Sequence, residues 1–174
     1  MIEMIADWDV SAADEGQIVR LLARCFDNDF GGRSYFQQRP QFRMIWREGG
    51  QIIGHMAVVM RAIRLNGVLF DVAGLADVAT HPDHRGKGIA AVLLKSTIAQ
   101  VRAAQTQYFL LFGTAALYGA HGFAAAPNLM TYIDLRGAVT GAVKTEVAQE
   151  LRVLPLGGQA WPADAPVDLL GHLF

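Results

Sequence analysis

The chain is poor in cysteine and in charge. It has one cysteine, Cys25, and charged residues make up only 18% of its 174 positions. A lone cysteine cannot close a disulfide within the chain, so covalent cross-links do not hold the fold together. Lysine and arginine number 15 against 16 aspartates and glutamates, which leaves no positive excess to follow a nucleic-acid backbone. A disulfide-stabilised scaffold is excluded, and a nucleic-acid partner is not expected.

Long apolar runs are also missing. No stretch approaches the roughly 20 apolar residues that a membrane span requires. The opening residues, MIEMIADWDV, lack the basic segment and apolar core of a signal peptide. Hydrophobic residues nevertheless make up 52% of the chain, enough to bury a sizeable core. We therefore expect a single domain over residues 1–174, cytoplasmic, with no membrane partner.

Hydrophobic periodicity in the first half predicts strands and one amphipathic helix. Residues 1–10 are typical of a short strand, and residues 11–26 of a helix that Ser11 caps. The apolar face of this helix is expected to comprise Ile18, Leu21, Leu22, Cys25 and Phe26. Runs rich in β-forming residues then flank two tight-turn signals, Gly49-Gly50 and Asn66-Gly67. The first half is therefore expected to form an antiparallel sheet of hairpins.

The pattern changes in the second half. Residues 86–105 predict a helix, residues 106–114 a buried parallel strand, and residues 115–122 a short helix. Residues 129–137 predict another strand, and the tail from residue 146 is expected to hold one strand and two proline-bearing turns. An antiparallel front followed by strand, helix and strand indicates a mixed α/β fold with one parallel βαβ crossover.

The segment ATHPDHRGKGIAAVLLK, residues 79–95, carries the most specific chemical signal. A strand leads into a turn with two glycines, and a helix follows. Glycines let backbone N–H groups approach phosphate oxygens, and the N-terminus of the helix presents partial positive charge to them. Arg85 and Lys87 add cationic donors. The pattern favours a phosphate site, with a plain strand-to-helix turn as the alternative.

Two other phosphate motifs fit this segment less well. A P-loop needs four residues between its glycines and then Lys-Ser/Thr, which GKGIA does not provide. Gly86, Gly88 and Ala91 satisfy the G-x-G-x-x-A spacing of a dinucleotide fold. That fold also requires an acidic residue about twenty positions further on and repeated βα units, and the sequence shows neither.

A third pattern fits the segment. Arg85, Gly88 and Ala90 form an R-x-x-G-x-A motif that resembles the signature of the GCN5-related N-acetyltransferases (GNAT). The resemblance extends from about residue 13 to residue 136 and follows the order of elements in that family. It implies the GNAT fold, acetyl-CoA as co-substrate and no metal, with the loop gripping the pyrophosphate of coenzyme A. The implied cofactor-binding residues are Val78, Ala79, Thr80, Arg85, Gly86, Lys87, Gly88, Ile89 and Ala90.

Acetyl transfer to an amine needs an acid for the departing sulfur and often a base for the incoming ammonium. The resemblance implies the acid, and three features could supply the base: Asp77, the pair Asp27 and Asp29, and the C-terminal carboxylate of Phe174. LYGAHGF, residues 117–123, is similar to a later motif of the family, in which a tyrosine lies near the coenzyme sulfur. Tyr118 is therefore the implied acid that protonates the leaving thiolate. Asp77 lies on the strand beside the expected thioester, and a carboxyl in an apolar run is costly without a partner, which favours a general base over a solvated strand-edge carboxylate. Thr114 stands near the position where the family often has an asparagine, and it could hydrogen-bond the coenzyme.

The acceptor side is suggested by narrower resemblances. Asp27 and Asp29 follow the first helix, where the family builds its acceptor site, although aspartates also favour turns. ARCFDNDF, GLADVATHPDHRGKG and LYGAHGF resemble the aminoglycoside 2'-N-acetyltransferases, which implies that Asp29 and the Phe174 carboxylate contact substrate ammonium groups. VLPLGGQAWPADAP is similar to the ending of the nodulation protein A acyltransferases, which also modify an amino-sugar amine. Ala76 departs from the glutamate of the aminoglycoside enzymes.

These features together predict an acetyl-CoA-dependent N-acetyltransferase. It would move an acetyl group to a primary amine of a small molecule, such as an amino-sugar or aminoglycoside, by direct attack in a ternary complex. Two alternatives remain: a non-catalytic module that binds or senses acyl-CoA, and an N-acyltransferase with a longer acyl donor. His81 and His84 lack a third ligand at a recognisable spacing, so we expect no metal. A homodimer is a further expectation from the family.

Overall fold

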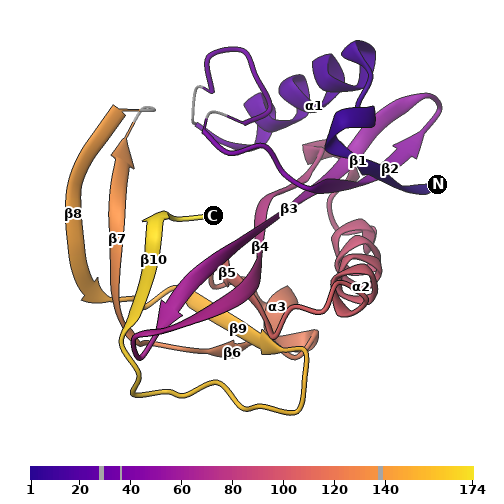
Figure 1. The fold of residues 1–174 in the computed structure, drawn as a ribbon. Helices are drawn as coiled ribbons and strands as arrows, with labels where there is room; N and C mark the ends of the chain where they lie inside the picture. The colour runs from indigo at the N-terminus through magenta and orange to yellow at the C-terminus, as the bar shows by residue number, and fades with distance from the viewer. Residues whose placement is uncertain (28–29, 36, 137–138) are drawn as a thin grey trace. The chain divides into compact units, whose positions relative to one another are not determined.

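The computed structural model describes residues 1–27, 30–35, 37–136 and 139–174, which form two compact units. The first unit comprises Met1–Val59 and Ala76–Gln100, and the second comprises Met60–Leu75 and Val101–Phe174. Two long strands pass from one unit into the other, β3 (Gln51–Leu65) and β4 (Val68–Thr80) (Figure 1). Each unit is therefore assembled from two separate stretches of sequence. The expectation of a single domain stays a prediction.

The first unit contains the antiparallel strands that the sequence predicts. β1 (Ile2–Ala6) pairs with β2 (Phe42–Glu48), and β2 pairs with the beginning of β3. Gly49 and Gly50 connect β2 to β3 with φ angles of 55° and 81°, a left-handed conformation that glycine adopts without steric cost. Short 3₁₀ turns follow β1 and β4, namely η1 (Asp7–Asp9) and η2 (Pro82–His84). The first predicted hairpin is confirmed.

Helix α1 (Ala12–Cys25) begins where the sequence predicts. The Ser11 hydroxyl oxygen accepts a hydrogen bond from the backbone N–H of Asp14 at 3.1 Å, so Ser11 is the N-cap. The predicted apolar face is buried in a cluster that comprises Ile18, Leu21, Leu22, Ile45, Ile52 and Ala79, with Cys25 and Phe26 packed at its margin. Each fully buried aliphatic side chain contributes roughly 1.5–3 kcal/mol, so this face fixes α1 on its strands.

Helix α2 (Ile89–Arg102) is shorter than predicted. The sequence pattern suggested a start at residue 86, but Gly86 and Gly88 have φ angles of 77° and 78°, which no α-helix accommodates. The helix packs directly on the backbone of β3. A Cβ at Gly54 would lie 2.8 Å from Ile89 and 2.9 Å from Leu93, so only glycine allows this close approach.

In the second unit, the strand order is β6-β9-β5-β4-β3-β10-β7-β8. The strands not yet given are β5 (Tyr108–Phe112), β6 (Ala124–Ala125), β7 (Leu129–Arg136), β8 (Val139–Val147), β9 (Leu151–Pro155) and β10 (Val167–His172). β4 and β5 pair in parallel, with Val72 opposite Tyr108, and α2 lies between them along the chain. This arrangement confirms the predicted βαβ crossover and the mixed sheet.

The C-terminal tail differs from its prediction. One strand was expected after residue 146, and the tail contains both β9 and β10. β9 pairs antiparallel with β5 and β6, whereas β10 pairs in parallel with β7 and antiparallel with β3. The prediction of a single strand is wrong because these strands are specified by partners far away in the sequence and not by a strong local alternation.

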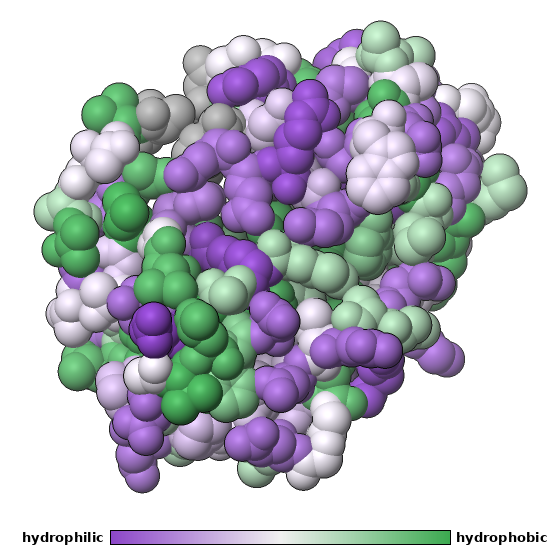
Figure 2. Space-filling model, in the orientation of Figure 1, coloured by the Kyte–Doolittle hydropathy of each residue, from purple (hydrophilic) through white to green (hydrophobic). Residues whose placement is uncertain are grey.

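One edge of the second unit has an apolar surface. β8 ends the strand order, and its side chains Val139, Val143 and Val147 are 67%, 69% and 47% exposed. In Figure 2, apolar side chains are interspersed with less apolar ones along the edge where β8 lies in Figure 1. None of the helices in the described part of the chain is long and apolar enough to cross a membrane.

Candidate active site

The predicted phosphate loop is an exposed turn between η2 and α2. Gly86 and Gly88 are left-handed, and no atom lies within 4 Å of the position that a Cβ would take at either residue. Glycine is therefore required for conformation and not for space. The Arg85 guanidinium donates through Nε to the Thr80 carbonyl at 3.4 Å, which ties the loop to the end of β4. The first N–H groups of α2 have no intrahelical acceptor and can serve an anion.

The two histidines beside this loop are engaged with other side chains. Their rings meet edge to face, with centroids 5.6 Å apart. His81 Nε2 lies 2.8 Å from Nη1 of Arg24, so that ring nitrogen accepts a hydrogen bond from the guanidinium. Within the described residues, no three His, Cys, Asp or Glu side chains cluster in a way that could hold a metal ion.

Asp77 interrupts the regular geometry of β4. Its φ of 50° is left-handed, a conformation that costs a non-glycine residue roughly 1 kcal/mol and that aspartate tolerates better than most residues. The Asp77 carbonyl accepts a hydrogen bond from Nδ1 of His55 at 2.9 Å. Burial raises the pKa of the Asp77 carboxyl from 3.8 to about 6, although the nearby Arg43 guanidinium lowers it. A carboxylate of this pKa is a suitable base near neutral pH.

A buried polar chain lies behind Asp77, and the sequence reasoning missed it. Nη1 of Arg43 lies 3.2 Å from Nε2 of His55, and the same guanidinium donates through Nε to Asp7 at 2.9 Å. Arg43 and His55 are 0% exposed, and Asp7 is 5% exposed. The available signal was the presence of a cation and a histidine within predicted apolar strands, where polar groups need partners.

The remaining predicted residues of the first unit lie along β4 and after α1. Val78, Ala79 and Thr80 follow Asp77 directly, and the Thr80 carbonyl also accepts a hydrogen bond from the Cys25 thiol at 3.4 Å. Asp27 is exposed just beyond α1, whereas Asp29 lies outside the described residues. The first unit therefore contains the predicted phosphate loop, the strand predicted to lie beside the thioester, and the predicted base.

Tyr118 lies in the second unit on the short helix α3 (Ala116–Ala120). A Cβ at Gly113 would lie 3.1 Å from the Tyr118 ring, so the glycine lets the ring pack on the backbone that leaves β5. Burial raises the pKa of the Tyr118 hydroxyl above its ordinary value near 10, so the group keeps its proton and can donate it. Thr114 is exposed in the loop between β5 and α3.

Phe174 also lies in the second unit, packed against β4. Its ring occupies the space where a Cβ at Gly74 would be, only 2.0 Å from the nearest ring atom, so glycine is obligatory there. The ring stacks on Phe112 with centroids 6.2 Å apart and lies beneath the Arg61 guanidinium at 4.1 Å. Because Phe112 adjoins Gly113, contacts link Phe174 to Tyr118 within this unit.

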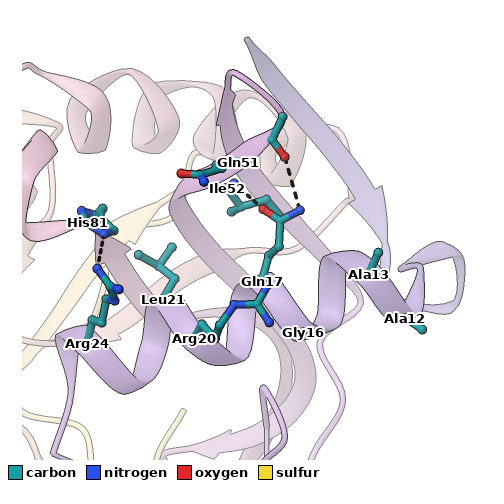
Figure 3. Close-up of a pocket in the computed structure, with 11 residues that line it drawn as sticks. Ala12, Ala13, Gly16, Gln17, Arg20, Leu21, Arg24, Gln51, Ile52 and His81 are labelled. Carbon is teal, nitrogen blue, oxygen red and sulfur yellow. Dashed lines mark hydrogen bonds between the residues drawn. The ribbon is translucent and has the colours of Figure 1, made fainter.

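A groove of about 560 Å³ lies in the first unit, beside α1. Figure 3 shows Gln17 in its wall, where the side-chain amide donates to the Gly50 carbonyl at 3.3 Å and accepts from the Ile52 N–H at 2.8 Å. The charged side chains that line it are Arg20 and Arg24. None of the predicted catalytic residues lines this groove.

A family model described as "Acetyltransferase (GNAT) domain" matches residues 9–126, which is more than half of the chain. The chain belongs to the GNAT acetyltransferase family. The match includes the phosphate loop, Asp77 and Tyr118, and it confirms the resemblance that the R-x-x-G-x-A motif indicated. The protein is accordingly a GNAT-type N-acetyltransferase. No curated protein matches the chain in sequence.

Solved GNAT structures share the fold. YhbS from Escherichia coli, in complex with CoA, gives a TM-score of 0.67 at 19% identity over 97% of this chain and 88% of that one. A GNAT family acetyltransferase from Brucella melitensis, in complex with acetyl-CoA, gives 0.61 at 18% identity over 95% and 94%. The ribosomal-protein-S18-alanine N-acetyltransferase from E. coli gives 0.59 at 16% identity over 93% and 100%. These likenesses establish the GNAT fold for the chain.

Proposed function

We propose that the protein transfers an acetyl group from acetyl-CoA to a primary amine of a small molecule. The observation that carries this proposal is the loop Arg85–Ala90, in which two left-handed glycines precede the N-terminus of α2. Such a loop offers backbone N–H groups and a guanidinium to a diphosphate. Similar GNAT structures were determined with CoA or acetyl-CoA, which supports the same donor here.

The predicted residues have separate roles in the proposed reaction. Asp77 takes a proton from the acceptor ammonium and leaves a neutral amine that attacks the thioester carbonyl. Backbone N–H groups along Val78–Thr80 polarise that carbonyl. As the C–S bond breaks, Tyr118 gives its proton to the departing thiolate; the nitrogen that has bonded to the acetyl carbon releases its second proton to solvent, which reprotonates Tyr118. Thr114 is proposed to hydrogen-bond the coenzyme.

An amino-sugar or aminoglycoside is the acceptor class to test first. Its ammonium groups are proposed to contact three carboxylates, those of Asp27, Asp29 and the C-terminal residue Phe174. The support is the narrower resemblance carried by ARCFDNDF and LYGAHGF. A homodimer is proposed as well, supported by the apolar exposed side chains of the edge strand β8.

The loop can be tested by its glycines. Gly88→Ala puts a Cβ on a left-handed residue and distorts the turn, so we expect the Kd for acetyl-CoA to rise about tenfold or more in calorimetry. Gly158→Ala is the matched control, because that glycine has open space around it and no left-handed φ. Equal affinity in the two variants would remove the loop from coenzyme binding.

The reaction itself is tested by thiol release from acetyl-CoA in the presence of amino-sugars, polyamines and peptides. Turnover with an amino-sugar but not with peptides supports the proposal. Binding of acetyl-CoA without turnover on any amine would instead favour a sensing module. Faster thiol release from a longer acyl-CoA than from acetyl-CoA would favour the longer-donor alternative.

A further inference from the structure

The tautomer of His55 follows from its two neighbours. Arg43 is always a donor, so the His55 Nε2 that lies 3.2 Å from its Nη1 must accept. A carbonyl is only an acceptor, so the His55 Nδ1 that lies 2.9 Å from the Asp77 carbonyl must carry the hydrogen. Both conditions hold only in the neutral Nδ1–H tautomer. Burial, and secondarily Arg43, lower the pKa of His55 to about 3, which keeps this form at neutral pH.

The series of buried polar contacts continues from His55 to an ion pair between Arg43 and Asp7. Asp7 lies 2.8 Å from Arg43 and also pairs with Arg39, so the buried guanidinium has its counter-charge. Asp7 fixes Arg43, Arg43 fixes the His55 ring, and the ring holds the Asp77 carbonyl. These residues come from η1, β2, β3 and β4 of the first unit. This series of hydrogen bonds therefore ends at Asp77, the residue of β4 that has a left-handed φ.

We propose that Asp7, Arg43 and His55 are positioning residues that hold the left-handed backbone at Asp77 and so direct its carboxyl. The inference rests on the proposed function, in which Asp77 is the base. A return of Asp77 from its left-handed φ to that of an ordinary strand would rotate its Cα–Cβ bond about the backbone and so redirect the carboxyl. Misplacement of a catalytic group by about 1 Å can cost roughly 100-fold in rate.

The test uses His55→Leu, which removes both hydrogen bonds, and His55→Asn, whose amide N–H₂ can still donate near the Nδ1 position. We expect His55→Leu to lower kcat about 30-fold or more while the Kd for acetyl-CoA stays within about twofold. His55→Asn should recover most of this loss. Thr97→Val is the control, since it deletes a buried hydroxyl of the same unit that forms no hydrogen bond with Asp7, Arg43 or His55.

The pH profile and NMR separate positioning from mere stability. Arg43 is the charged group that faces Asp77, and Arg43 and Asp7 are the charged groups that face His55. His55→Leu should move the acid limb of kcat/KM to lower pH as the carboxyl becomes solvated, whereas Thr97→Val should not move it. Imidazole ¹⁵N shifts of the wild-type protein should show the neutral Nδ1–H tautomer of His55.

An Nε2–H tautomer, or an unchanged kcat and acid limb in His55→Leu, overturns the proposal. If the wild-type protein acetylates no amine, the proposed function fails. The positioning role is then decided by NMR alone, from the tautomer of His55 and from the change in the backbone chemical shifts of Asp77 that His55→Leu causes.

A second inference comes from Arg61 on β3 in the second unit. Burial lowers the pKa of its guanidinium from 12.5 to about 10. Its Nη2 donates to the His172 carbonyl and its face covers the Phe174 ring, but its buried Nε has no hydrogen-bond partner among the described residues. A largely buried guanidinium with an unpaired Nε is costly, which makes it a candidate for a ligand anion.

We infer that Arg61 binds an oxyanion of the acceptor, with a carboxylate as the commonest such group beside an amine. The inference also rests on the proposed function: within the class of small amines, it favours acceptors that also carry an acid, such as amino-uronic acids, over aminoglycosides. It is supported by the contacts that lead from Arg61 through Phe174 and Phe112 toward Tyr118, the proposed acid. Arginine is suited to this role because its planar donors match a carboxylate.

Matched acceptors test this inference. The wild-type protein should acetylate an amino-uronic acid or amino acid with kcat/KM about tenfold or more above the corresponding amide, and Arg61→Gln should abolish this preference with little change in acetyl-CoA affinity. Phosphorylated amino-sugars form a separate arm that distinguishes a phosphate from a carboxylate. If the wild-type protein acetylates the acid acceptor and its amide at equal rates, the inference is overturned. Equal rates are also the result expected if the Phe174 carboxylate already neutralises Arg61. If no acceptor reacts, NMR titration of the wild-type protein and Arg61→Gln with an amino acid decides the binding role alone.

Discussion

Asp77 and His55 have pKa values that burial shifts in opposite directions. The pKa of Asp77 rises from 3.8 to about 6, and that of His55 falls from 6.5 to about 3. Between about pH 4 and pH 6, native Asp77 holds a proton that it would lose on unfolding, and native His55 lacks a proton that it would gain. The two contributions to the pH dependence of stability therefore cancel in the wild-type protein over this window.

Single substitutions should reveal these two opposite contributions. In Asp77→Asn, only the shifted pKa of His55 still contributes to the pH dependence of stability. The free energy of unfolding, compared with that of the wild-type protein, should therefore fall by about 1.4 kcal/mol per pH unit as pH drops from about 6 to 4. In His55→Asn only Asp77 remains, and the free energy should fall as pH rises across the same window. Urea unfolding at several pH values measures both. Parallel pH profiles for the two variants would show that these shifts are absent.

Tyr118 gives a prediction that concerns a single oxygen atom. Tyr118→Phe removes the proposed proton donor and keeps the ring on Gly113, so kcat should fall about 100-fold while acetyl-CoA affinity is nearly unchanged. Steady-state kinetics and calorimetry provide the two measurements. Tyr132→Phe, which loses a hydroxyl bonded to Glu146, is the matched control in the same unit. Turnover equal to that of the control would exclude Tyr118 as the acid.

At the scale of elements, the packing of α2 on β3 depends on one glycine. Gly54→Ala would place its Cβ 2.8 Å from Ile89 and 2.9 Å from Leu93, which forces the helix to move or the side chains to change rotamer. Overpacking of this kind typically costs about 1–3 kcal/mol, so the urea midpoint should fall. Gly157→Ala, with open space around it, should change stability little. A Gly54→Ala variant as stable as this control would contradict the packing argument.

At the scale of the whole molecule, neither unit is continuous in sequence, because β3 and β4 run through both. A unit that unfolds while the other stays folded would have to break these strands in their middle. We therefore expect a single cooperative unfolding transition. Variants that keep only Trp46 in the first unit, or only Trp161 in the second, report on each unit by fluorescence. Coinciding urea midpoints would support this view, and clearly separate midpoints would refute it.

The elements that could be predicted were those with local signals. Ser11 as the cap of α1, the glycine turns at Gly49-Gly50 and Asn66-Gly67, and the left-handed glycines of the phosphate loop all depend on neighbours within a few residues. The start of α2 was placed three residues too early because helical hydrophobicity does not report the φ of a glycine. The tail was expected to hold one strand and not two because β9 and β10 both pair with strands that are remote in the sequence.

The sequence by itself determined the family, the phosphate loop and the residues proposed as acid and base, because these are encoded in short motifs. The tertiary structure alone decided what surrounds them. Asp7 and Arg43, which are 36 residues apart, meet behind Asp77, and Phe174 packs on Gly74 beside Arg61. Burial raises the pKa of Asp77 and the Arg43 guanidinium, from a distant strand, lowers it, and no local pattern of residues encodes such contacts.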